Sequence, residues 1–171
     1  MSQVTVPMCL RNRGSKRGSV VVESGVTLVL MFGLLFLLID LALAVFTKAT
    51  LQNAVRQGVR FAVTGQTLPS YTYLNDSITA VVQQNALGLL NGNSGACKIA
   101  ISYYNPGGST ASAGGGNIVQ VTVQGYSYHP LGPILRSGAP VPISATAADV
   151  MEQCPVSGCP PVTNPIPISC P

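Results

Sequence analysis

Residues 24–46, SGVTLVLMFGLLFLLIDLALAVF, form a long apolar run in which Asp40 is the one ionisable residue. As an α-helix rising 1.5 Å per residue, the run would extend roughly 35 Å, enough to cross a hydrocarbon core of about 30 Å. A buried core helix is the alternative, but the rest of this 171-residue chain is too small and too rich in glycine to surround such a segment. We therefore expect one transmembrane helix.

Basic residues gather immediately before the apolar run. Four of the nine lysines and arginines lie there: Arg11, Arg13, Lys16 and Arg17. By the positive-inside rule, the N-terminus is expected to stay in the cytoplasm and the rest of the chain to cross the membrane. Single-strand binders interleave aromatic with basic residues, and this chain does not, so nucleic acid is not an expected partner.

Three processing routes are compatible with the N-terminal region. The helix could remain as an uncut anchor, a signal peptidase could cut after Ala44, or the chain could be cut between Gly18 and Ser19. The third route is favoured because Glu23 follows that glycine at the fifth position, at the mouth of the helix. A carboxylate costs about 2.5–3.5 kcal/mol at the centre of a span and less near the interface, so it usually has a role or a partner. The helix dipole would explain an acid here, but not the preceding Gly-Ser.

The stretch GSVVVE at residues 18–23, the apolar run with Asp40, and LQNAVRQGVR at residues 51–60 together resemble the TadE-like pseudopilins of tight-adherence (Flp-type) pilus systems. The resemblance covers about residues 17–65. It implies that a membrane-embedded aspartyl prepilin peptidase cuts after Gly18, and that Glu23 guides recognition or pairs with a neighbouring subunit's amino terminus. The chain departs from the pattern at Ser24, where an aromatic residue is common, and in lacking the proline often found a few residues later.

The resemblance implies a minor pilin or pseudopilin that acts in assembly of such a pilus or secretion system. Its expected partners are the lipid bilayer, the prepilin peptidase, other pilin or pseudopilin subunits and the pilus assembly platform. It would cross the bacterial inner (cytoplasmic) membrane once, with its C-terminus periplasmic or extracellular, or lie in the pilus. The alternative is an extracytoplasmic binding protein, either anchored by a single span or released by signal peptidase.

Asp40 lies near the outer end of the expected span. Water or snorkelling could satisfy its carboxylate there, or it could pair across subunits, and the sequence does not choose between these two interpretations.

Removal of residues 1–18 would take away Cys9 and leave an even set of cysteines, which is what disulfides on the oxidising side of a membrane require. The four are Cys97, Cys154, Cys159 and Cys170. They allow three pairings, among which the sequence does not choose. A zinc site is disfavoured because His129 is the single histidine and no Cys-x-x-Cys occurs. No metal or cofactor is expected.

Apolar residues continue at helical spacing beyond the membrane: Leu51, Ala54, Val55, Gly58, Val59 and Ala62. They predict one helix over about 19–64 that ends at Gly65 and packs its outer half on a head. A second helix is expected from Asp76 to about Leu90, with Asn75 or Asp76 as its cap. Alternating residues predict strands at 98–104 and 118–128, with a Gly-rich hairpin loop at 106–117 between them, and a third strand is expected at 141–150.

These elements predict an α+β fold: a long N-terminal transmembrane helix continues into a small pilin-like head with a second helix and a three-stranded antiparallel sheet. The expected divisions are a cytoplasmic leader peptide at 1–18, the transmembrane helix at 19–46, a periplasmic head at 47–152 and a Pro/Cys-rich tail at 153–171. The acids other than Glu23 are too scattered to propose a catalytic pair, and the chain is not expected to be an enzyme.

Overall fold

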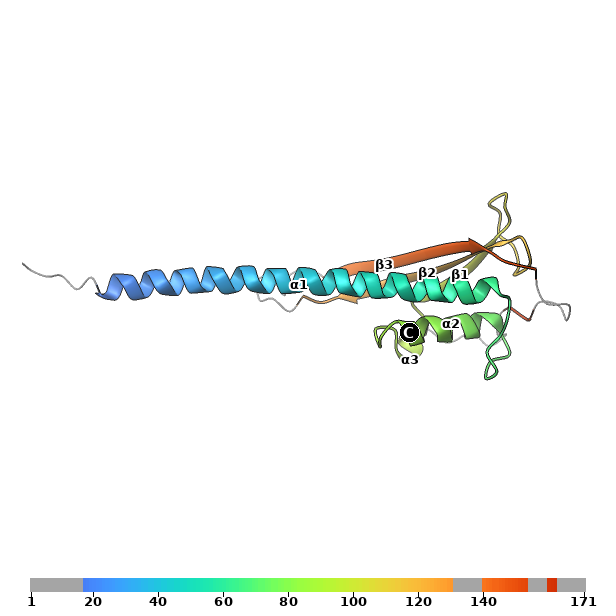
Figure 1. Ribbon diagram of the computed structural model, residues 1–171, viewed down its shortest axis with the longest axis horizontal. Helices are drawn as coiled ribbons and strands as arrows, with labels where there is room; N and C mark the ends of the chain where they lie inside the picture. The colour runs from blue at the N-terminus through green and yellow to red at the C-terminus, as the bar shows by residue number, and fades with distance from the viewer. Residues whose placement is uncertain (1–16, 131–139, 154–159, 163–171) are drawn as a thin grey trace, which may run out of the picture.

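The computed structural model describes residues 17–130, 140–153 and 160–162. Its elements, in chain order, are α1 (Arg17–Val63), α2 (Leu74–Asn85), α3 (Gly92–Ala96), β1 (Ile99–Tyr104), β2 (Ile118–Tyr128) and β3 (Val141–Val150). The N-terminal part of α1 stands alone as a rod, and all other elements gather along its C-terminal part (Figure 1). The predicted α+β architecture is confirmed.

Helix α1 contains 47 residues and so extends roughly 70 Å. It ends as predicted, because Gly65 adopts a φ of 60° and donates its backbone N–H to the Ala62 carbonyl oxygen at 3.0 Å. A positive φ costs glycine little, which explains why the helix stops there.

The sheet is antiparallel, with the strand order β1-β2-β3. Val119, Val121 and Val123 of β2 are fully buried on one face, as the alternation in the sequence predicted. The pairing with β3 shifts register between Val123 and Tyr126, where Gly125 has a φ of 68°. This irregularity lets the long hairpin twist while its inner face continues along α1.

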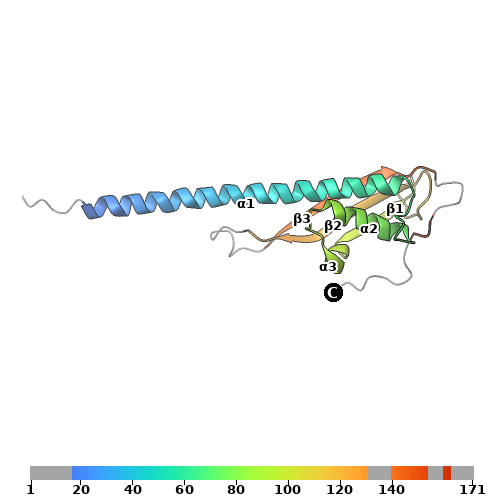
Figure 2. The same ribbon diagram turned by 60° about the horizontal axis from the view of Figure 1, so that its bottom comes forward.

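The inner face of the sheet forms one core with α1 and α2, and the predicted stripe from Leu51 to Ala62 is buried in it. Figure 2 shows α2, α3 and the sheet together beside the outer part of α1. Helices α1 and α2 approach closely at Gly58, where a Cβ atom would overlap the Val82 side chain. A larger residue at position 58 would therefore force the two helices apart.

The bounds and the cap of α2 differ from the prediction. The helix begins at Leu74 and ends at Asn85, its N-cap is Tyr73, and no side chain caps it. Instead, the tail supplies acceptors: Leu74 donates its N–H to the Pro161 carbonyl oxygen at 3.0 Å, and Asn75 donates to that of Val162 at 3.1 Å. Asn75 and Asp76 lie inside the first turn, so the predicted cap was wrong. The cause is a contact with a segment far away in the sequence.

The hairpin of β2 and β3 runs along the whole outer half of α1. At the far end, Glu152 donates its backbone N–H to the Val63 carbonyl oxygen at 3.1 Å. At the near end, Tyr128 reaches Asp40, with its hydroxyl 3.4 Å from the carbonyl oxygen. The head therefore extends along the helix below residue 47, down to the level of Asp40.

Candidate functional site

The N-terminal part of α1 makes no packing contact with the described part of the head. Its described side chains from Val20 to Ile39 are exposed, apart from half-buried Gly33. Two hydroxyl groups turn back onto the helix backbone: Ser24 donates to the Val21 carbonyl oxygen at 3.0 Å, and Thr27 to that of Glu23 at 2.9 Å. Because these hydroxyls are satisfied locally, the part of this stretch that follows Glu23 offers lipid an apolar surface on every side.

Among the described residues, α1 is the one helix long and apolar enough to cross a membrane, and this suggests membrane anchoring. The rise from Val20 to Asp40 is about 30 Å, which equals the thickness of a typical hydrocarbon core. Asp40 therefore marks the place where the free rod ends and the head begins.

The residues of the expected processing site lie at the free end of α1. Gly18 and Ser19 fall in its first turn, and Glu23 is exposed in the next. Glu23 and Asp40 are about 26 Å apart along the helix axis, so the structure does not bring the two acids together. They lie near opposite ends of the apolar stretch, where each needs its own partner.

Asp40 is enclosed by its own chain, with only 3% of its surface exposed. Tyr128 lies against it, and both burial and the neighbouring Asp40 carboxylate raise the pKa of the Tyr128 hydroxyl. Among the described residues, no buried side-chain nitrogen or oxygen lacks a hydrogen-bond partner. The sequence offered water, snorkelling or pairing across subunits for Asp40. The structure buries it within one subunit, where Tyr128, from a distant segment of the chain, is in contact with it.

The face of α1 that Asp40 shares with Thr47 is polar and covered, while the opposite face is apolar and uncovered. Thr47 is buried and donates its hydroxyl to the Leu43 carbonyl oxygen at 2.8 Å. On the opposite side, Leu41, Val45 and Phe46 are exposed, Phe46 by 56%. A surface helix of a water-soluble protein covers its apolar face and exposes its polar face. This part of α1 does the opposite, so it is better suited to contact with lipid than with water.

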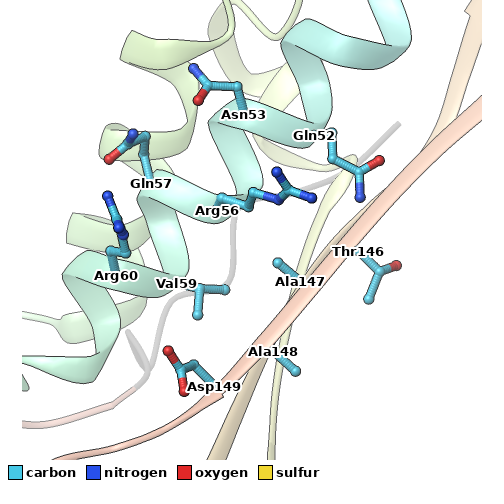
Figure 3. Close-up of a pocket in the computed structure, with 10 residues that line it drawn as sticks. All are labelled: Gln52, Asn53, Arg56, Gln57, Val59, Arg60, Thr146, Ala147, Ala148 and Asp149. Carbon is cyan, nitrogen blue, oxygen red and sulfur yellow. The ribbon is translucent and has the colours of Figure 1, made fainter.

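A second feature is an open cleft of about 550 Å³ between the outer half of α1 and β3 (Figure 3). It is lined by Gln52, Asn53, Arg56, Gln57, Val59 and Arg60 of the helix and by Thr146, Ala147, Ala148 and Asp149 of the strand. In Figure 3, Arg56 extends from the helix toward the strand, and Asp149 lies on the strand side of the gap. The charges are mixed and the cleft is open, so its residues do not select a ligand class.

The disulfide candidates lie mostly outside the described residues. Cys97, at the end of α3, is half-buried and is described, whereas Cys154, Cys159 and Cys170 are not. Their pairing stays a prediction. No group of three His, Cys, Asp or Glu side chains in the described part of the chain could hold a metal ion.

Comparison with known proteins identifies the segment that carries these features. Residues 18–60 match the family model described as TadE-like protein. The match begins at Gly18, includes Glu23 and Asp40, and ends at Arg60. No curated protein and no solved structure matches the chain. The resemblance seen in the sequence is thus confirmed for residues 18–60.

Proposed function

We propose, from the TadE-like identity of residues 18–60, that this protein is a minor pilin or pseudopilin of a tight-adherence (Flp-type) pilus or secretion system. It is cut after Gly18 by a prepilin peptidase and stored in the inner membrane with its head in the periplasm. From there it joins other pilin or pseudopilin subunits on the assembly platform. Its role is structural rather than catalytic.

The observation that carries this proposal is the apolar rod that the head leaves uncovered. From Val20 to Ile39 the helix is exposed all round, while the head packs along the helix from Asp40 outward. Such a rod can exchange lipid contacts for contacts with neighbouring helices without any rearrangement of the head. This is the property that a subunit needs in order to leave a membrane and enter a helical assembly.

Glu23 has a definite part in this exchange. Cleavage after Gly18 makes Ser19 the first residue and Glu23 the fifth, close to a new, positively charged amino terminus. An exposed carboxylate at the membrane surface can remain hydrated, but it needs a partner when it enters a packed bundle of helices. The amino terminus of a neighbouring subunit provides that partner and fixes the axial register between subunits.

The location of Asp40 argues against the alternative of release by signal peptidase. A cut after Ala44 would separate the head from Asp40, which lies under Tyr128. It would also expose the end of the sheet near Tyr128, which α1 covers. An uncut single-pass anchor remains the competing hypothesis, and it differs from our proposal in the fate of residues 1–18.

Substitution at the two candidate cleavage sites separates these hypotheses. Gly18→Leu should leave the protein with its leader, so that an unprocessed form accumulates in the membrane. Ala44→Leu is the matched control, because it blocks a signal-peptidase site and leaves Gly18 intact. Intact mass of membrane-extracted protein gives the readout, in cells that contain the prepilin peptidase. Accumulation of the precursor with Ala44→Leu instead would overturn the proposal.

A further inference from the structure

We propose that the membrane-proximal end of the β2–β3 hairpin, formed by Tyr128 and Val141, lies in the headgroup layer of the bilayer. The head would then touch the membrane at a second place beside the anchor helix, and this contact would set its tilt. The inference rests on the membrane anchoring of α1, and it assigns a lipid-binding surface to the head itself.

The hairpin end lies at the level of α1 where the membrane span ends. The hydrocarbon core accounts for about 30 Å, the rise from Val20 to Asp40. Tyr128 contacts Asp40, and Tyr128 is paired in the sheet with Val141. Both strand ends therefore lie at the level along α1 where the hydrocarbon core ends.

Beside the hairpin, α1 has its polar residues on the covered face and its apolar residues on the exposed face. At this level Asp40 and Thr47 face the head, and exposed Phe46 belongs to the opposite face. The apolar surface of the span thus continues past Asp40 on the side that the head leaves open. Phe46 lies about 9 Å farther out along the helix axis than Asp40. If lipid headgroups and upper acyl chains surround Phe46, they also surround the hairpin end, which contacts Asp40.

The composition of the two strand ends also suits the interfacial layer of a membrane. Residues 126–130 and 140–143 contain no Asp, Glu, Lys or Arg, but they include two tyrosines. Val141 leaves 46% of its surface exposed at the first position of β3. Tyrosine is enriched where one end of a side chain is apolar and the other is wet, as in the interfacial layer. The surface fits lipid better than open water.

The chain contains no tryptophan, so a single introduced tryptophan reports its own depth. Val141→Trp probes the hairpin end, and Tyr128→Trp is a second probe that keeps an aromatic ring there. Phe32→Trp probes the span, and Tyr71→Trp probes the exposed loop before α2, at the end of the head far from the rod. Each full-length variant is reconstituted into phosphatidylcholine vesicles that contain lipid brominated either near the headgroup or near the chain end.

We expect shallow bromine to remove roughly half or more of the Val141→Trp emission, and deep bromine to quench Phe32→Trp. Tyr71→Trp should be quenched by neither. If both hairpin probes are quenched no more than Tyr71→Trp while Phe32→Trp is quenched, the inference fails and the membrane anchor stands. If Phe32→Trp is not quenched either, the anchoring itself fails. Quenching or spectral shifts that require a high protein-to-lipid ratio would assign this surface to a neighbouring subunit and also overturn the inference.

Discussion

The Tyr128 hydroxyl lies 3.4 Å from the backbone carbonyl oxygen of Asp40, a residue 88 positions earlier in the chain. This contact joins the foot of the sheet to the point where the free rod of α1 begins. It adds to the shared core through which the head and the outer half of the helix pack as one unit. The contact also gives the acid at the outer end of the span a structural task within one subunit.

Replacement of Asp40 should destabilise the packing of the head against α1 at the Tyr128 end of the sheet. Asp40→Ala removes an enclosed carboxylate and leaves its polar neighbours unsatisfied, at a cost of about 1–3 kcal/mol in the free energy of unfolding. Leu41→Ala is the matched control, because Leu41 is the next residue in the chain and its own side chain is exposed. Urea unfolding in detergent, followed by near-UV circular dichroism, measures the difference. Equal stabilities for the two variants would show that Asp40 does not hold the head.

The close approach of α1 and α2 should tolerate no side chain at Gly58. Gly58→Leu overpacks the contact with Val82 and is expected to destabilise the head by roughly 1–3 kcal/mol. Gly25→Leu is the control in the same helix, because a Cβ atom there meets nothing within 4 Å. Thermal unfolding in detergent checks both variants. A loss of stability with Gly25→Leu that matches the loss with Gly58→Leu would argue against this close packing.

Asn75 and Asp76, in the first turn of α2, are expected to contribute different amounts to the free energy of unfolding. Asn75 accepts a hydrogen bond of 2.7 Å from the buried Tyr103 hydroxyl, whose pKa is raised by that burial. Asn75→Ala leaves the hydroxyl without its acceptor and should cost about 1–3 kcal/mol. Asp76→Ala should cost less, about 0.3–1 kcal/mol, because it loses only a favourable charge near the helix N-terminus.

Measuring Asn75→Ala in a chain that also carries Tyr103→Phe shows whether Asn75 acts through this hydrogen bond or as a helix cap. In a Tyr103→Phe chain, Asn75→Ala should have a much smaller effect on the unfolding free energy, since no hydroxyl is left to satisfy. If Asn75→Ala lowers the unfolding free energy equally with Tyr103 and with Phe at position 103, the Asn75 side chain does not act through the Tyr103 hydroxyl.

The cysteines predict a difference between the precursor and the mature protein. The precursor contains Cys9, which stays on the cytoplasmic side, and cleavage after Gly18 removes it. Alkylation of the denatured, unreduced mature protein should therefore label no thiol, and the same reaction after reduction should label four. The precursor should show one thiol before reduction. Labelling of unreduced mature protein at two or more positions would contradict the disulfides.

The parts of the fold that follow local periodicity could be predicted from the sequence. The apolar stripe of α1 from Leu51 outward is spaced for a helix, and β2 and β3 alternate so regularly that their bounds were predicted as observed. The free rod was evident too, because Asp40 is the one ionisable residue in the apolar run. These features depend on neighbours within a few positions, which a single sequence displays.

Contacts between distant segments could not be predicted in this way. The carbonyl groups of Pro161 and Val162 cap α2, and backbone acceptors leave no mark in the sequence. Asp40 is likewise in contact with Tyr128, which is equally remote in the sequence. A weak signal did exist, since Asp40 and Thr47 lie two helical turns apart on one face of an otherwise apolar segment. That pattern indicates a covered polar face, but not which strand covers it.

The most direct test of the central claim is the N-terminal sequence of the protein purified from the membranes of cells that carry the prepilin peptidase. Our account predicts that the sequence starts at Ser19, with the apolar rod attached and Glu23 at the fifth position. A start at Val45 would show that signal peptidase had removed the rod, and an intact Met1 would show an uncut anchor. Either of these would contradict the assignment of this protein as a processed pilin or pseudopilin.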